Sequence, residues 1–162
     1  MPLSVSKSVE LRLPADRDYI VVAKRCASAL ASAAGFDVES LDELTIAVAQ
    51  VCENAIECLD RAGALAGEVR LVFKVEDASI EVSVKSTVTR EAEIEARVRL
   101  DNERRARDRE RALLEKQQGP SRRALDTDLA LRLMGLLVDD HSYRLDERTG
   151  GLRVRLTKYR IS

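Results

Sequence analysis

The residues best placed to do chemistry lie within residues 41–60, where carboxylate and amide side chains recur at helical spacing. At about 100° per residue, Gln50 and Asn54 project to one side of a helix, together with Glu43 and Glu57. This side therefore carries acidic and amide groups that could line a pocket.

The opposite side of the same stretch is apolar and must face a core. Its apolar residues follow the i, i+3, i+4, i+7 recurrence of an amphipathic helix. They are Leu41, Leu44, Val48, Val51, Cys52, Ala55 and Leu59. Ser40, with Glu43 three residues later, has the pattern of a capping box, so we expect the helix to begin there.

Few other residues have side chains that could bind a metal or take part in catalysis. Asp126 and Asp128 flank Thr127 and could bind a metal, or could begin a helix by capping its free amides. His141 is the single histidine and has no Ser or Cys partner in its pattern, so we expect an ordinary turn or strand position. The three cysteines lack zinc-site spacing and are expected to be small core residues in a reduced, cytoplasmic protein.

Composition favours one globular domain over residues 1–162, with 45% apolar residues and only 3% aromatic ones. The net charge of −1 gives no overall basic field, so nucleic acid is not an expected partner. No apolar run approaches the roughly 18 residues of a membrane span, and no signal-peptide pattern opens the chain.

Periodicity predicts the order β, α, α, β, β, charged segment, α, β, β. Alternating apolar residues indicate strands at 8–13, 68–75, 79–85, 141–145 and 152–159, and helical spacing indicates helices at 16–34, 41–60 and 122–139. Hairpins outnumber βαβ crossovers. We therefore expect an α+β two-layer sandwich: a mostly antiparallel mixed sheet with three main helices on one face.

Residues 89–120 break this pattern, because Arg and Glu dominate and large apolar residues are scarce. We interpret them as a charged, lid-like insertion. The alternatives to a lid are a solvated helix with internal salt bridges and a helix that docks a protein partner.

The order of elements resembles the histidine-kinase-type ATPase domain (the Bergerat fold), and more narrowly the anti-sigma-factor serine kinases of bacterial partner-switching systems. The resemblance covers nearly the whole chain. It is carried by LRLPADRDYIVVAKRCASALASAAGF, by LDELTIAVAQVCENAIECL and by the ending LRVRLTK.

The resemblance implies a role for two residues of the second helix. The family pattern there is Glu-x-x-x-Asn followed by Ala, in which Glu is the general base and Asn coordinates magnesium. Gln50 stands at the base position and Asn54 at the metal position. A neutral glutamine cannot accept a proton as a carboxylate does. The resemblance thus implies that Asn54 is a magnesium ligand. The alternative is an amide on the helix face that makes local hydrogen bonds.

The two glycine-rich nucleotide motifs of the family are also altered. Ser86 stands where an aspartate would bind the adenine amino group, and Val88 and Arg90 replace glycines that let backbone approach the nucleotide. Asp126 and Asp128 replace glycines of the loop that holds phosphates at a helix N-terminus. Carboxylates at that place would repel a triphosphate.

These departures favour a regulator that sequesters a sigma factor, an anti-sigma antagonist or both, as a homodimer, without phosphorylating them. We expect no cofactor in that case. One alternative is an active protein-serine kinase that uses ATP and Mg²⁺ and phosphorylates an antagonist. Another is a dimerising component of a larger signalling assembly.

Overall fold

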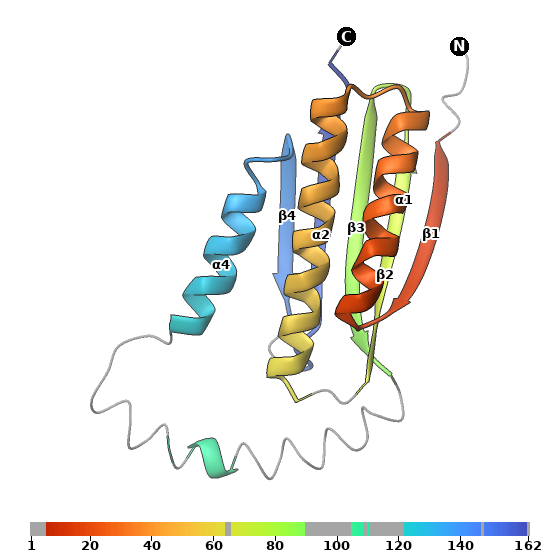
Figure 1. Ribbon diagram of the computed structural model, residues 1–162. Helices are drawn as coiled ribbons and strands as arrows, with labels where there is room; N and C mark the ends of the chain where they lie inside the picture. The colour runs from red at the N-terminus through yellow and green to blue at the C-terminus, as the bar shows by residue number, and fades with distance from the viewer. Residues whose placement is uncertain are drawn as a thin grey trace.

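One five-stranded antiparallel sheet, in the order β1-β2-β3-β5-β4, carries the helices on one face (Figure 1). The computed structural model describes residues 6–63, 66–89, 105–108, 110, 122–146 and 148–161, with side chains in the last helix from Asp128 onward. The strands are β1 (Lys7–Pro14), β2 (Gly67–Val75), β3 (Ser79–Val88), β4 (Asp140–Leu145) and β5 (Leu152–Tyr159). The helical elements are η1 (Arg17–Tyr19), α1 (Ile20–Ala33), α2 (Val38–Arg61) and α4 (Arg122–Met134).

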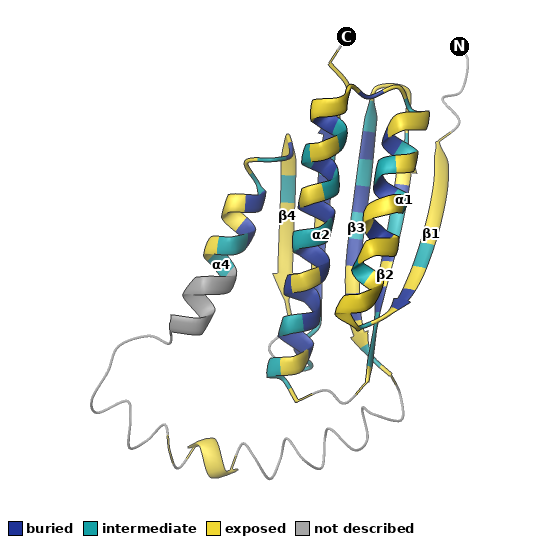
Figure 2. Cartoon of the chain, in the orientation of Figure 1, coloured by how far each residue is buried: buried dark blue, intermediate teal, exposed yellow. Residues whose placement is uncertain are grey.

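The expected α+β sandwich is confirmed, and all four strand pairings are antiparallel. Figure 1 shows α1, α2 and α4 on the same side of the sheet. The opposite face carries no described helix, and the alternating burial along β3 and β5 reflects that difference between the faces (Figure 2).

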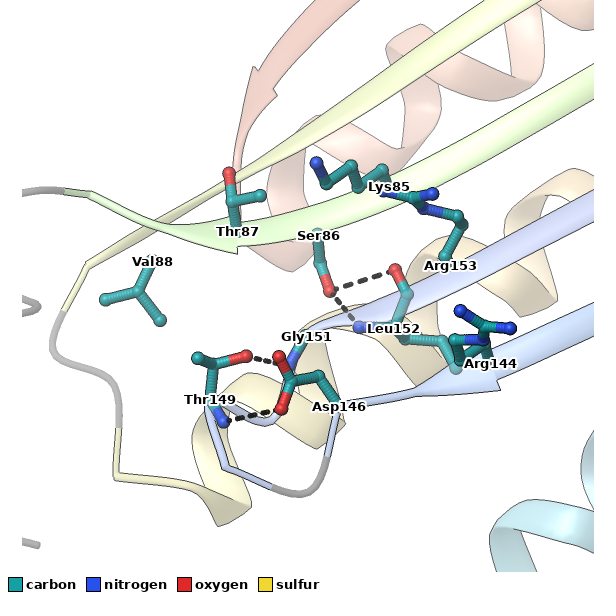
Figure 3. A pocket seen from close by; sticks show the side chains of 10 residues that line it. All are labelled: Lys85, Ser86, Thr87, Val88, Arg144, Asp146, Thr149, Gly151, Leu152 and Arg153. Carbon is teal, nitrogen blue, oxygen red and sulfur yellow. Dashed lines mark hydrogen bonds between the residues drawn. The ribbon is translucent and has the colours of Figure 1, made fainter.

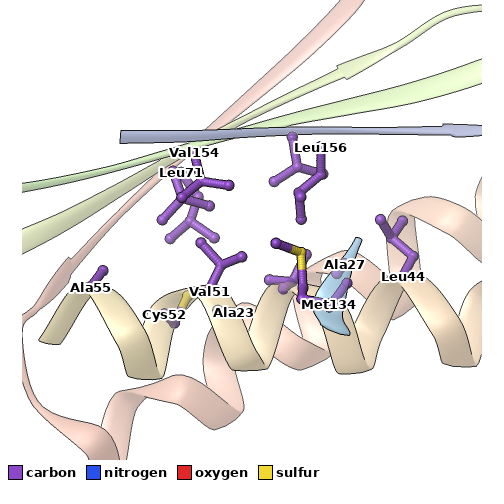
Figure 4. Packing of buried hydrophobic residues seen from close by; sticks show 14 of the residues in the cluster. Ala23, Ala27, Leu44, Val51, Cys52, Ala55, Leu71, Met134, Val154 and Leu156 are labelled. Atoms are coloured by element: carbon purple, nitrogen blue, oxygen red, sulfur yellow. The ribbon is translucent and has the colours of Figure 1, made fainter. Parts of the chain in front are cut away.

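Alternating aliphatic residues build the sheet half of the core, and the apolar face of α2 supplies the helix half. Figure 4 shows Val51 and Cys52 of α2 beneath Leu71, Val154 and Leu156 of the strands. Alanines on α1 let that helix approach α2 closely. They are Ala23, Ala27 and Ala31, all fully buried. The near absence of aromatic residues is thus matched by close packing of small aliphatic ones.

Two helix ends differ from the sequence expectation. Asp37, rather than Ser40, caps α2: its carboxylate accepts the Ser40 N–H at 2.7 Å, and Ser40 lies inside the helix. The last helix ends at Met134 instead of continuing to Asp139. Its end is followed by Gly135, where an added Cβ would lie 2.3 Å from the His141 ring.

Glu43 was expected on a pocket-lining face, and it instead ties α2 to the sheet. Its carboxylate accepts a hydrogen bond from Nζ of Lys158, which also donates to the Leu137 carbonyl at 3.1 Å. Lys158 occupies the helix-facing row of β5 and is only 7% exposed. A charge buried in this way needs a partner, and Glu43 provides it.

Candidate functional site

Asn54 lies in the part of α2 where almost every side chain is buried. It is 5% exposed, and its Oδ1 accepts a hydrogen bond from Nε2 of Gln50 at 3.3 Å. Its Nδ2 is the only buried side-chain nitrogen or oxygen without a hydrogen-bond partner in the described part of the chain. The amide oxygen thus accepts one hydrogen bond and keeps a second lone pair, while the amide nitrogen has no partner.

Burial at this end of α2 has a tertiary cause. The turn between β4 and β5 lies against the end of the helix, with Gly150 at φ +74°. A Cβ on Gly150 would lie 2.4 Å from Cβ of Ala62 and 2.8 Å from the carbonyl oxygen of Cys58. Only glycine fits both this left-handed backbone and this close approach.

Gln50 is half-buried and directs its amide at Asn54. This i, i+4 pair is a local bridge along one helix face. Glu53, the nearest carboxylate in sequence, is exposed. Gln50 therefore brings a neutral amide to Asn54, and the neighbouring carboxylate of Glu53 is exposed to solvent.

Ser86, at the position that the resemblance assigns to adenine recognition, is 2% exposed. Its Oγ accepts the Leu152 N–H at 2.9 Å and lies 3.5 Å from the Leu152 carbonyl oxygen (Figure 3). The hydroxyl thus joins β3 to the first residue of β5. Its hydrogen-bonding capacity is used within the fold.

Asp126 and Asp128 were predicted at a metal site or a helix start; the helix start is wrong, and the metal site stays a prediction. The helix begins at Arg122, so both Asp126 and Asp128 lie inside α4. The Asp128 carboxylate binds Nε of Arg132 at 2.8 Å and accepts a hydrogen bond from the Tyr143 hydroxyl of β4. This hydrogen bond raises the pKa of Tyr143. Asp128 therefore fastens α4 to the sheet, while the side chain of Asp126 lies outside the described residues.

The remaining expected positions are described in part. Val88 is the last residue of β3, whereas Arg90 lies outside the described residues. Within the charged segment 89–120, residues 105–108 and 110 are helical and exposed, and most of the rest lies outside the described part of the chain. The lid hypothesis for this segment stays a prediction.

A cavity of about 400 Å³ opens where β3 ends against the β4–β5 turn. Figure 3 shows its lining residues from these three strands and the turn. Among them, Asp146 accepts the N–H groups of Arg148 and Thr149 at 2.9 and 3.4 Å, which lowers its pKa. The walls include Lys85, Arg144 and Arg153, so the cavity is more basic than acidic. Sequence reasoning missed it, because the lining residues are up to 68 positions apart, from Lys85 to Arg153.

The histidine and the cysteines have structural surroundings. His141 is half-buried and its ring lies over Gly135. Burial raises the pKa of Cys52 to about 12 and raises the pKa of Cys58, which keeps both thiols protonated. The expectation that the cysteines are small core residues holds for these two, since both are buried.

At the described positions that the resemblance assigns to ATP and magnesium, the side chains are engaged in hydrogen bonds or ion pairs within the fold. The amide oxygen of Asn54 is bonded to Gln50, the Ser86 hydroxyl is bonded to Leu152, and Asp128 is bonded to α4 and β4. No hydrogen bond or ion pair among the described residues joins these three groups. Nor does this part of the chain contain a cluster of three or more His, Cys, Asp or Glu side chains able to hold a metal ion. None of its helices is both long enough and apolar enough to cross a membrane.

Comparison with known proteins agrees with the architecture. The pattern of a family described as "Histidine kinase-like ATPase domain" matches residues 13–158. The serine-protein kinase RsbW of Bacillus licheniformis is 30% identical over 76 residues, which is 47% of this chain and 47% of that protein. RsbW of Listeria innocua is 30% identical over 81 residues, covering 50% of this chain and 51% of the relative. The chain spans about half the length of the curated relatives it matches.

Proposed function

This chain belongs to the histidine kinase-like ATPase domain family, whose pattern it matches from residue 13 to residue 158, and on that premise we propose that it regulates transcription by binding proteins rather than by phosphorylating them. Its partners in this proposal are a sigma factor, an anti-sigma antagonist or both, in a bacterial partner-switching system. It acts in the cytoplasm as a homodimer.

The observation that carries the proposal is the closed position of Ser86. The resemblance assigns this position a hydrogen bond to adenine. Here the Ser86 hydroxyl is buried against the Leu152 backbone. An adenine would have to displace a strand-to-strand hydrogen bond in order to reach it. Gln50 supports the same conclusion for the general base, because a neutral amide, hydrogen-bonded to Asn54, stands where the family has a carboxylate.

Exposed leucines on α4 support binding to another protein. Leu129 and Leu133 are each 56% exposed, and Leu136, just after the helix, is 81% exposed. Leu129 and Leu133 are four residues apart, which places them on one face of α4. Leu136 follows three residues later. An apolar strip of this kind is typical of a protein-binding surface.

The decisive experiment is titration of ATP with Mg²⁺ into the purified protein by calorimetry, followed by size measurement with candidate sigma factors and antagonists. We expect no heat of nucleotide binding and a stable complex with at least one candidate. Leu133→Asp should weaken that complex. Val38→Asp is the matched control, because Val38 is an exposed valine on α2. Magnesium-dependent ATP binding together with phosphate transfer to an antagonist would overturn the proposal.

An active serine kinase is the second candidate, and one observation favours it. Asn54 is retained, and its buried Nδ2 lacks a partner. Exchange of the amide oxygen and nitrogen by a half-turn of the side chain would aim the oxygen at that unpartnered position, where a cation could bind. The similar proteins are also named as serine-protein kinases. Transfer of labelled phosphate from ATP to a purified antagonist would establish this activity, and Asn54→Leu should abolish it.

A further inference from the structure

A row of basic residues crosses the open face of the sheet from one edge to the other. The strand register pairs Arg12 with Arg70, Arg70 with Lys85, Lys85 with Arg153, and Arg153 with Arg144. Paired positions on neighbouring strands point to the same face, with Cβ atoms about 5 Å apart. All five side chains are exposed. Along β2, β3 and β5 they alternate with the buried residues that face the helices, so the row lies on the opposite face.

The β1–β2 half of this row is neutralised within the molecule. Glu10 lies between Arg12 and Arg70, and its carboxylate accepts hydrogen bonds from Nε of Arg12 at 2.8 Å and from Nε and Nη2 of Arg70 at 2.9 and 2.8 Å. Glu68 adds a weaker contact to Arg12 at 3.9 Å. The structure thus shows how a carboxylate fits between neighbouring cations of this row.

The β3–β5–β4 half has no such partner. Lys85, Arg153 and Arg144 make no ion pair or side-chain hydrogen bond within the described residues, although they stand directly opposite one another. We name these three residues the basic triad. Like charges placed opposite each other on paired strands are unfavourable, so an external anion would relieve them.

Two described carboxylates near the triad already have partners. Glu81 lies two rows from the triad, 3.7 Å from Arg155 of the row between; Asp140, also two rows away, is exposed. Asp146 lines the same cavity as the triad, but accepts N–H groups of its own turn. Among the described lining residues, three cations and one carboxylate surround a hollow of about 400 Å³.

We infer that the basic triad docks an acidic segment of a protein partner, with carboxylates at alternate positions of an extended chain. Carboxylates at alternate positions lie about 7 Å apart and can reach neighbouring cations whose Cβ atoms are about 5 Å apart. At the other end of the row, the single Glu10 carboxylate already bonds two neighbouring arginines. A single phosphate group offers one anionic centre, whereas an acidic segment offers a separate carboxylate for each cation. Nucleic acid is disfavoured, because the net charge of the protein is −1 and the described part of this face offers only Tyr159 for stacking.

The inference rests on the proposed function, since it names the chemistry of a protein partner. It places that partner on the sheet face opposite α2 and α4. A surface there leaves the exposed leucines of α4 available to a second contact, so each surface can be removed by mutation without touching the other.

The test measures fluorescence anisotropy of a labelled peptide with glutamate at three alternate positions, and of a matched peptide with glutamine there. We expect the glutamate peptide to bind and the glutamine peptide not to bind. Binding of the glutamate peptide should weaken as the salt concentration is raised. Arg153→Gln and Arg144→Gln should each raise its Kd about threefold to fivefold, as expected for exposed ion pairs.

The matched control is Arg155→Gln, on the same strand and face but paired with Glu81. It should change Kd by less than about twofold. Equal losses for Arg155→Gln and Arg153→Gln, or equal binding of both peptides, would overturn the inference. Tighter binding of tripolyphosphate than of the glutamate peptide would also overturn it, in favour of a compact phosphate site.

The same variants separate this inference from the proposed function. If candidate sigma factors and antagonists fail to bind while the glutamate peptide binds through the triad, the proposed function fails and the docking surface stands. If a candidate binds, but the glutamate peptide does not bind and the triad variants bind the candidate as wild type does, the docking surface fails and the proposed function stands. An unchanged amide NMR spectrum of each variant verifies folding.

Discussion

Ser86 and Leu152 are 66 positions apart in sequence, and the N–H of Leu152 donates to the Ser86 hydroxyl at 2.9 Å. This bond links β3 to the start of β5 at the mouth of the cavity in Figure 3. It turns a position that the resemblance assigns to nucleotide recognition into a structural bond between strands.

Ser86→Ala should lower the free energy of unfolding by about 1–3 kcal/mol, because the buried Leu152 N–H loses its acceptor. Urea denaturation measures the change. Thr87→Ala is the control, since Thr87 is the exposed neighbour and should cost less than about 0.5 kcal/mol. Equal costs for the two variants would show that the bond contributes nothing.

Ser86→Asp restores the residue of the family motif and should still fail to give ATP binding. The carboxylate would be buried beside the Leu152 carbonyl oxygen, so we expect a larger loss of stability than for Ser86→Ala. Calorimetry with ATP and Mg²⁺ decides the point. Restored nucleotide binding in a folded variant would contradict this reading of the site.

Asn54→Leu should leave stability unchanged or raise it by up to about 1 kcal/mol, because it removes a buried donor that has no partner. Gln50 is only half-buried and can turn its amide to water. Asn54→Ala is the matched variant, and it should be less stable than Asn54→Leu because it leaves a cavity. Thermal unfolding compares the two, and a loss above about 1 kcal/mol in Asn54→Leu would mean that the amide has a partner in solution.

Removing Glu43 should cost far more than removing the lysine that it neutralises. Glu43→Ala leaves the buried ammonium of Lys158 without its carboxylate, which we expect to cost about 3 kcal/mol. Lys158→Met replaces the charge by an apolar chain of similar length and should be close to neutral. Glu53→Ala, an exposed carboxylate on the same helix, is the control for denaturation measurements. The reverse order of stabilities would refute the assigned role.

Glu10 should make the protein more stable at neutral than at acidic pH. The arginine pair, Arg70 first and Arg12 second, lowers the pKa of Glu10 from 4.5 to about 2. A carboxyl whose pKa is lower in the folded state stabilises the fold above its unfolded pKa, and this contribution disappears as the pH falls from about 4.5 towards 2.

The comparison uses wild type and Glu10→Gln in urea titrations at several pH values. Wild type should be the more stable at pH 7, and the difference should vanish near pH 2. High salt should shrink the difference, since the group is exposed. A difference that persists unchanged at low pH would point to packing rather than charge.

The sequence alone determined the type and order of the elements, because their periodicity is local. Alternation of apolar residues along β2 and β5, and helical spacing along α2, each follow from which side must leave water. The Gln50–Asn54 pair is equally local, since residues four apart on a helix are neighbours.

Tertiary structure decided which chemically capable residues remain available. Asn54 is buried on the packed side of α2, and Ser86 is closed by a strand 66 residues away. Glu43 serves a buried lysine on the last strand, and Asp128 fastens α4 to β4. The basic triad exists only because the register of three strands aligns three cations on one face. Periodicity fixes which side of an element faces the core, whereas pairing between distant elements fixes what each polar group meets there.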